Sequence, residues 1–287
     1  MRSLRRLVEA RRTLVQDRVR LTNRITAALK AYFPQVLDWF RDKEAAVFAD
    51  FIERWPTLEL AQRARIDTLA AFFRTHNVRY QTAIDRRITA IRQELPLTTD
   101  LASIQPNRLL VDVLLPQLRA ACAAIDRLDA EIGKLAPELP DYALFRALPG
   151  AGAALAPRLL VAFGERRERF PDAASLQKYA GVAPITKRSG NKSSVHWRYR
   201  CPTFLRQTFI EWVGQTIPRS FWANAFYAGC KARGMKHQAA LRALAFKWIR
   251  VLYRCWVDRV PYDEARYLLA LQKRQAPLLK VATSLSS

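Results

Sequence analysis

A short basic segment with three serines holds the residues of this sequence that are best suited to covalent chemistry. It reads Lys187-Arg188-Ser189-Gly190-Asn191-Lys192-Ser193-Ser194. A serine hydroxyl is a poor nucleophile unless a base or a charged field activates it. Lys187, Arg188 and Lys192 could clamp a phosphate and stabilise the charge that develops during attack. Gly190 would keep a serine hydroxyl sterically accessible, so this flexible loop is a candidate for attack on a phosphate.

A simpler interpretation of the same segment involves no chemistry. Serine, glycine and asparagine are common turn residues, and the basic side chains could contact phosphate without any reaction. His196 follows closely, but no acidic residue stands near it in the sequence to complete a catalytic triad. These residues alone leave both interpretations open, a reactive serine and a solvated turn.

The surrounding residues form a strongly cationic stretch. Between Ala173 and Val257 there are fifteen Lys or Arg residues and a single acidic residue, Glu211. Large apolar side chains are frequent in the same stretch, which indicates a folded core and not a disordered tail. A folded lobe with so few carboxylates is expected to bind a polyanion, most commonly nucleic acid. The candidate phosphate contacts are Arg198, Arg200 and Arg206, and then Arg242, Lys247, Arg250 and Arg254 on a predicted helix.

The composition of the whole chain also favours a nucleic-acid partner. Its 287 residues include 48 Lys and Arg and 25 Asp and Glu, which gives a formal net charge of +23, and 50% are hydrophobic. Phosphate binding should be strong and salt-sensitive, although a ribosome-associated protein or a binder of anionic membranes would share this charge. The four cysteines are scattered without a Cys-x-x-Cys pair, which predicts reduced thiols and no metal site. With no signal peptide or membrane segment in view, we expect a cytoplasmic, nucleoid-associated protein.

A glycine-containing turn is the second candidate phosphate site. Between two helical segments lies Leu148-Pro149-Gly150-Ala151-Gly152, a pattern that resembles a helix-hairpin-helix element. Gly150 and Gly152 would let the backbone approach a DNA phosphate, and the N-terminus of the following helix adds partial positive charge. Such contacts read no base sequence. The alternative is a tight turn that needs two glycines only for packing.

The elements that must position these residues are predicted to be mainly helical. Residues 1–33 read as one helix with a coiled-coil-like repeat at Leu7, Leu14, Leu21 and Ala28. A linker-like stretch is predicted from Pro96 to Pro106, and a second long helix over residues 107–135. The seam of that helix is Leu118, Ala121, Ile125, Leu128, Ile132 and Leu135. The two seams could pair as an antiparallel hairpin or across a homo-oligomer, and the sequence does not decide.

Capping and breaking residues divide the chain into four parts. We place a basic helix at 1–34, a helical, coiled-coil region at 35–140, a serine-bearing domain at 141–271 and a polar tail at 272–287. Thr57 and Asp172 are predicted helix N-caps, and Gly181 is predicted to follow the end of a short helix. A long amphipathic helix is expected from about Lys236 to Val257. The expected fold is therefore mainly α, with long coiled-coil-like helices followed by a compact helical domain.

Five motifs then follow one another in a recognisable order: L-P-G-A-G-A-A-L-A-P, E-R-F-P-D-A-A-S-L-Q-K-Y-A-G-V-A-P, K-R-S-G-N-K, C-P-T-F-L-R-Q-T-F and H-Q-A-A-L-R-A-L-A-F-K-W-I-R. Over roughly residues 141–271 they resemble the C-terminal transposase domain of the insertion-sequence 110/116/902 family. Residues 1–34 resemble the basic helical segment that follows that family's N-terminal domain. The resemblance implies a DNA transposase or recombinase that moves an insertion sequence and cleaves and rejoins DNA through a serine. That serine falls on Ser189, ahead of Ser193 and Ser194.

The resemblance also implies an RNA partner and an acidic domain whose pattern is not found in this sequence. Members of the family use a structured bridge RNA as a guide and an N-terminal RuvC-like DEDD domain whose acidic residues bind divalent metal. Glu9, Asp17 and Asp38 do not reproduce that pattern. We therefore predict an N-terminally truncated transposase, with no cofactor in this chain, Mg²⁺ expected only for the acidic domain, and autonomous catalysis left open. The alternatives are a non-catalytic DNA- or RNA-binding remnant and a basic structural RNA-binding protein.

Overall fold

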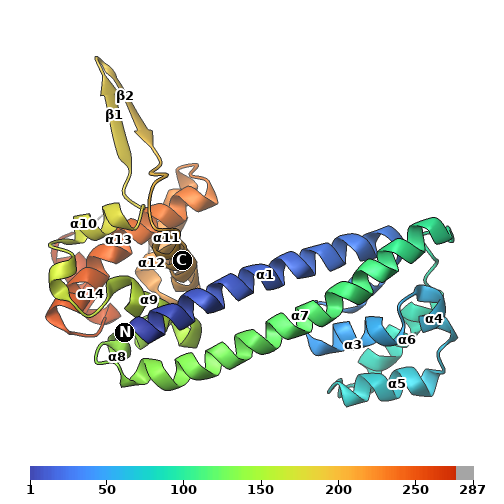
Figure 1. Cartoon of the computed structure of the whole chain (residues 1–287). Coiled ribbons are helices and arrows are strands. Elements are labelled where there is room, and N and C mark those ends of the chain that lie inside the picture. The colour runs from blue at the N-terminus through green and yellow to red at the C-terminus, as the bar shows by residue number, and fades with distance from the viewer. Residues whose placement is uncertain (276–287) are drawn as a thin grey trace. The chain divides into compact units, whose positions relative to one another are not determined.

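The computed structural model describes residues 1–275, apart from the side chains of Lys187, Lys192 and Ser193. Across this part the chain is mainly α, as predicted, with one two-stranded sheet (Figure 1). It forms two compact units: the middle unit, Ala10–Leu128, and the C-terminal unit, which combines Met1–Glu9 with the chain from Asp129 on. The predicted tail at 272–287 lies outside the described residues from 276 on, and the predicted domain boundaries stay predictions.

The middle unit is an assembly of helices around an aromatic core. Its elements are α1 (Arg2–Tyr32, from Ala10 on), α2 (Val36–Trp39), α3 (Ala46–Arg54), α4 (Leu58–Arg63), α5 (Ile66–Thr75), α6 (Gln81–Gln93) and α7 (Leu101–Leu135, as far as Leu128). Helix α1 contains no Pro or Gly and ends two residues before Pro34, which cannot donate a helical hydrogen bond. Thr57 caps α4 as predicted, because its hydroxyl accepts a hydrogen bond from the Leu60 backbone N–H at 3.3 Å.

The two long helices run antiparallel within the middle unit (Figure 1). Near the end of α1, burial raises the pKa of Tyr32, and Asp112 of α7 adds to this effect while Arg108 opposes it. Ile25 of α1 and Leu118 of α7 are buried in the same core. In this unit α1 and α7 of the single chain therefore contribute to one core as antiparallel helices. Coiled-coil packing and pairing across an oligomer stay predictions.

The start of α7 corrects the predicted linker. The helix begins at Leu101 and continues through Pro106 and Pro116, so the stretch from Pro96 to Pro106 is helical in its second half. Asp100 begins the helix, since its carboxylate accepts from the Ala102 backbone N–H at 3.0 Å. Each proline lacks a helical N–H, and the amide side chain that follows it bonds one turn back. Asn107 donates to the Ser103 carbonyl at 2.8 Å, and Gln117 to the Val113 carbonyl at 3.1 Å.

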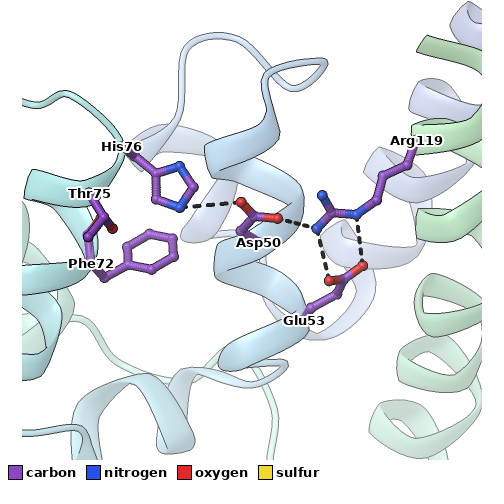
Figure 2. A network of polar contacts seen from close by, with 6 residues as sticks. All are labelled: Asp50, Glu53, Phe72, Thr75, His76 and Arg119. Carbon is purple, nitrogen blue, oxygen red and sulfur yellow. Dashed lines mark hydrogen bonds and ion pairs between the residues drawn. The ribbon is translucent and has the colours of Figure 1, made fainter. Parts of the chain in front are cut away.

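A polar network ties α3 to α5 and α7 (Figure 2). The guanidinium of Arg119 on α7 donates to both oxygens of Glu53, at 3.1 and 2.8 Å, and to Asp50. The other oxygen of Asp50 lies 3.3 Å from the ring nitrogen of His76, whose ring packs on Phe72 with centroids 4.5 Å apart. A planar guanidinium that engages two carboxylates fixes the approach of two helices more closely than a single ion pair does.

Replacing Arg119 with methionine should therefore destabilise the middle unit. We expect the free energy of unfolding to fall by about 1 kcal/mol, because the network is partly exposed and solvent screens it. Urea unfolding followed by circular dichroism measures this change. Arg127→Met is the matched control, since Arg127 is an exposed arginine of the same helix with no ion pair among the described residues. Equal unfolding midpoints for the two variants would contradict a bracing role.

The C-terminal unit packs short helices around a tryptophan core. Its helices are α8 (Tyr142–Arg146), α9 (Gly152–Phe163), α10 (Ala173–Tyr179), α11 (Thr203–Thr216), α12 (Phe221–Ala232), α13 (His237–Asp258) and α14 (Glu264–Lys273). Three 3-10 turns lie between them, at Ala136–Glu138, Arg167–Arg169 and Ile217–Arg219. Asp172 caps α10 by accepting from the Ser175 backbone N–H at 2.6 Å, and Gly181 follows the helix with φ +72°. These caps and the extent of α13 agree with the sequence predictions.

Four buried indoles favour one packing arrangement of this core, because the N–H group of each donates a hydrogen bond to an acceptor. Trp212 donates to the Pro149 carbonyl at 3.0 Å and Trp256 to the Gly164 carbonyl at 3.0 Å. Trp248 donates to the Thr216 hydroxyl at 3.0 Å, and Trp222 to the Tyr262 hydroxyl at 2.7 Å. A buried N–H without a partner would cost about 1–3 kcal/mol, so these bonds select one packing of α9, α11, α12 and α13.

Candidate nucleic-acid interface

The serine segment is a β-hairpin, which corrects the predicted flexible loop. Strands β1 (Ile185–Ser189) and β2 (Lys192–His196) pair antiparallel, with Ser189 opposite Lys192. Gly190 has φ +57° at the first central position of the two-residue turn, where a type II′ turn requires glycine. Figure 1 shows the hairpin extending away from the helices of its unit. The predicted turn at Gly190 is present, and ordered strands flank it.

Ser189 stands at the tip of this hairpin with its side chain exposed, and Arg188 is exposed as well. Successive residues of a strand point to opposite faces, so Arg188 lies on the face opposite to Ser189. A phosphate at the Ser189 hydroxyl would therefore not meet the Arg188 side chain from the same face. The exposed hydroxyl suits attack on an external phosphate, whereas a buried one would not.

A serine–histidine pair on β2 is the feature that sequence reasoning missed. The Ser194 hydroxyl and the Nε2 atom of His196 share a hydrogen bond of 2.8 Å, and both side chains are exposed. Residues two apart lie on one face of a strand, which brings them together once the strand is recognised. A serine within hydrogen-bond reach of a histidine has the geometry of a nucleophile and its base. Ser194 is thus a second candidate nucleophile.

A cationic cluster lies at the base of the hairpin, around Trp197. The guanidinium carbon of Arg242 on α13 lies 3.5 Å from the centre of the indole, and that of Arg206 on α11 lies 5.3 Å from it. Burial lowers the pKa of Arg242, and Arg206 lowers it further. Neither arginine forms an ion pair with any residue in the described part of the chain. Two guanidinium groups on one half-buried ring are a favourable place for a phosphate.

The other predicted basic contacts fall between the hairpin and α11. Arg200 is exposed, and Arg198 is half-buried with an Nε atom that lacks a hydrogen-bond partner. Ser189 is four strand steps, about 13 Å at about 3.3 Å each, from the Ile185–His196 pair at the base. The base arginines therefore cannot contact the phosphate that Ser189 would attack. The exposed serine at the tip and the arginines at the base are thus two separate places on the hairpin.

The single carboxylate of the cationic stretch is already engaged. Glu211 forms an ion pair with Arg158, a buried arginine whose Nε donates to the Thr208 hydroxyl at 3.3 Å. The other oxygen of Glu211 accepts a hydrogen bond from Gln207 at 2.6 Å. Glu211 is therefore held by α9 and its own helix, and the hairpin cations keep their charge for a ligand.

Trp197 should anchor the hairpin to α11 and α13. Trp197→Leu removes the ring beneath both guanidinium groups, and we expect a loss of about 1 kcal/mol in unfolding free energy. Trp197→Phe keeps an aromatic face and should retain about half of that stability. Thermal unfolding of the two variants beside the wild type tests the difference. Identical behaviour of the leucine and phenylalanine variants would mean that only apolar bulk matters here.

Gly150 and Gly152, in the turn between α8 and α9, have different surroundings. A Cβ atom at Gly150, where φ is +72°, would come within 2.6 Å of the Gln215 carbonyl oxygen. A Cβ atom at Gly152, where φ is +55°, would meet nothing within 4 Å, and the residue is exposed at the start of α9. Gly150 thus allows the turn to pack on α11, and Gly152 leaves the α9 N-terminus open to a phosphate. A helix-hairpin-helix role stays a prediction.

Within residues 1–275 there is neither a metal-binding cluster nor a helix that could span a membrane. No group of three or more His, Cys, Asp or Glu residues in that range could hold a metal ion. The four cysteines are free, Cys230 buried and the others half-buried. No helix in this range is long and apolar enough to cross a membrane.

The matched family model covers the hairpin and the glycine turn. Residues 142–228 match the model described as "Transposase IS116/IS110/IS902 family". Over 286 residues the chain is 31% identical to the "Mini-circle putative transposase for IS117" of Streptomyces coelicolor, which covers 96% of this chain and 66% of that protein.

Two further relatives come from elements of the same family. The chain is 27% identical over 270 residues to an uncharacterized 43.6 kDa protein of insertion element IS110 from Streptomyces coelicolor, covering 87% of this chain and 62% of that protein. It is 26% identical over 260 residues to an uncharacterized 44.8 kDa protein of insertion element IS116 from Streptomyces clavuligerus, and the match covers 90% of this chain and 64% of that protein. The chain thus spans slightly less than two thirds of the length of these relatives. It belongs to the IS116/IS110/IS902 transposase family.

Proposed function

We propose that this chain is the serine-bearing part of a DNA transposase, which cleaves and rejoins DNA strands through Ser189. The observation that carries the proposal is the exposed Ser189 hydroxyl at the tip of a hairpin, inside the segment that matches the family model. The cationic surroundings support a DNA substrate, because the surfaces around the hairpin lack free carboxylates in the described part of the stretch 173–257.

The proposed reaction is a transesterification at phosphorus. The Ser189 oxygen forms a bond to the phosphorus as its proton leaves, and the bond from phosphorus to one deoxyribose oxygen breaks. The released sugar hydroxyl takes up a proton. Attack by a hydroxyl of another strand then reverses the step, restores the serine and joins the new pair of strands. The phosphodiester count is conserved, so the exchange needs no external energy source.

The surrounding residues hold the strand for this step. Arg206 and Arg242, on the face of Trp197, would bind a phosphate near the base of the hairpin. Arg188, Arg198 and Arg200 would contact neighbouring phosphates, and Gly152 would present the N-terminus of α9 to another. These contacts fix the register of the strand but carry no base identity. Target choice then has to come from another partner, and a guide RNA is our proposal for it.

The donor set for a metal ion does not occur in the described residues. Asp17, for example, is paired with Arg20 at 2.7 Å on α1, and no step of the proposed reaction is assigned to a metal. Any Mg²⁺-binding carboxylates would come from outside residues 1–275. Oligomer formation and action at the nucleoid belong to the same proposal.

A trapping experiment tests the function. We would incubate the full chain with a DNA strand that contains a single bridging phosphorothiolate, in which sulfur replaces the leaving oxygen. The thiolate leaves without an acid, so attack traps the protein on the DNA. A band that resists denaturation and requires the bridging sulfur is the expected result. If substrates with sulfur on either side of the phosphorus give no adduct although the DNA is bound, the chain is a non-catalytic nucleic-acid-binding protein.

A further inference from the structure

A second basic site lies in a cleft between α13 and α14. The cleft has a volume of about 740 Å³ and is lined by Lys247, Arg250 and Arg254 from α13 and by Arg266 and Arg274 from α14 and its end. On α13, Arg250 follows Arg242 by about two turns and is rotated from it by roughly 80°, at about 3.6 residues per turn. The cleft is therefore separate from the arginines at the hairpin base.

The carboxylates of this cleft are already occupied. Asp258 is paired with Arg254 at 2.5 Å on the same helix. Asp263 caps α14, because its carboxylate accepts a hydrogen bond from the Arg266 backbone N–H at 3.1 Å. Within the described part of the chain, Lys247, Arg250, Arg266 and Arg274 form no ion pair. The cleft thus carries a local excess of positive charge.

The unpaired cations come from both of the helices that line the cleft. The Lys247 ammonium lies 4.6 Å from the centre of the Phe226 ring; burial lowers its pKa, Arg250 adds to this, and Cys230 opposes it. Burial also raises the pKa of Tyr267, whereas Arg250 and Arg274 both act to lower it. The charges of Arg250 on α13 and of Arg274 at the end of α14 therefore both act on Tyr267. An anion in the cleft would relieve the repulsion between these like charges.

The aromatic residues of the cleft show what kind of contact it can make. Tyr262 accepts a hydrogen bond from Trp222 and donates to Glu264 at 3.2 Å, and the Tyr267 ring lies 5.1 Å from that of Trp222. Both tyrosines are half-buried and contact the tryptophan core, which leaves them less available for base stacking. Single-strand binding sites usually combine stacking with a positive groove, and this cleft provides only the groove.

We infer that the α13–α14 cleft binds one sugar–phosphate strand of a nucleic acid through its backbone. Cations on both walls suit a single strand lying between the helices, whereas the body of a duplex could meet only the rim. Recognition by the backbone alone predicts binding that is independent of base sequence and strongly dependent on salt. This inference rests on the proposed function in one respect, namely that the partner is a nucleic acid.

The test removes one cation from each wall. Arg250→Gln combined with Arg266→Gln is compared with Arg79→Gln combined with Arg86→Gln, two exposed arginines of the middle unit that change the net charge equally. Fluorescence anisotropy measures binding to labelled oligothymidylate, to oligouridylate and to a duplex. For single strands we expect the cleft pair to bind roughly tenfold more weakly, with a salt slope lower by about 1.4, or about 0.7 for each lost contact. The control pair should stay near the wild type.

Several results would overturn the inference, and a second variant guards against misfolding. Arg274→Gln alone, at the exposed end of α14, should lower the salt slope by about 0.7. A loss equal to that of the control pair, or a loss confined to the duplex, would refute a single-strand cleft. Weaker binding of the cleft pair to single-stranded DNA or to single-stranded RNA supports the inference. The strand that is affected shows whether the cleft takes deoxyribose or ribose. If the serine adduct forms but binding does not depend on the cleft arginines, only the cleft inference is wrong. If binding depends on the cleft arginines but no adduct forms, only the proposed chemistry is wrong.

Discussion

Replacing Ser189 with alanine should abolish the trapped protein–DNA adduct, with a loss of roughly 10³-fold or more. The covalent bond needs the Ser189 oxygen, and the alanine side chain has no atom that can form it. The residue is exposed at the hairpin tip, so the fold and the DNA affinity should change little, by about twofold at most. Denaturing gels with the phosphorothiolate strand measure the adduct, and anisotropy with an unmodified duplex measures the affinity.

Ser194→Ala is the matched control for this experiment. Ser194 lies on the neighbouring strand, is equally exposed and bonds to His196. We expect this variant to keep the adduct within about tenfold of the wild type, because the hydroxyl then serves only as a surface hydrogen-bond group. Adduct formation that survives Ser189→Ala but disappears with Ser194→Ala would move the nucleophile to the Ser194–His196 pair and give the reaction a built-in base.

The second large effect is expected at Gly150. Gly150→Ala places a Cβ atom within 2.6 Å of the Gln215 carbonyl oxygen at a positive φ, so α11 or the turn must move. We expect a loss of about 3 kcal/mol or more in unfolding free energy, from backbone strain of about 1 kcal/mol or more and a clash with backbone atoms. Urea unfolding at several protein concentrations measures this loss.

Gly152→Ala should behave differently, because the added methyl group meets nothing within 4 Å. Its φ of +55° still costs about 1 kcal/mol. We expect near-normal folding together with a measurable drop in DNA affinity, since the methyl group would keep a phosphate from the start of α9. If Gly152→Ala leaves DNA binding unchanged, this turn serves packing alone and the helix-hairpin-helix interpretation is wrong.

Much of the helical framework could be predicted from local signals. Helix α1 has a continuous repeat without breakers, and Thr57 and Asp172 are capping residues in their usual positions. The prolines explain the wrong boundary predicted for α7, because a proline usually marks the edge of a helix whereas this helix runs through Pro106. Asp100, an acidic residue just before the apolar run, was the better signal for where that helix begins.

The hairpin could also have been predicted from the sequence. Gly190-Asn191 is a two-residue turn flanked by β-branched residues such as Ile185, Thr186 and Val195. The high content of serine and lysine suggested a loop, since these residues are typical of solvated turns. The strand pattern would then have placed Ser194 and His196 on one face.

Other parts of the candidate sites depend on tertiary structure. Arg242 meets Trp197 only because α13 packs beside α11, and no local pattern connects the two residues. The cleft between α13 and α14 likewise exists only once these two helices pack in the folded unit. The sequence indicates how much positive charge is available, while the packing decides where it gathers.

The exposure of the hairpin has a consequence for the proposed reaction. Every described side chain from Thr186 to His196 is exposed, and an isolated two-stranded ribbon is only marginally stable in water. We therefore expect the Ser189 hydroxyl to reach the orientation needed for the proposed attack only while DNA contacts both strands, as in induced fit. Binding energy from a long substrate would then be used to order the hairpin, so short DNA would be bound yet left uncut.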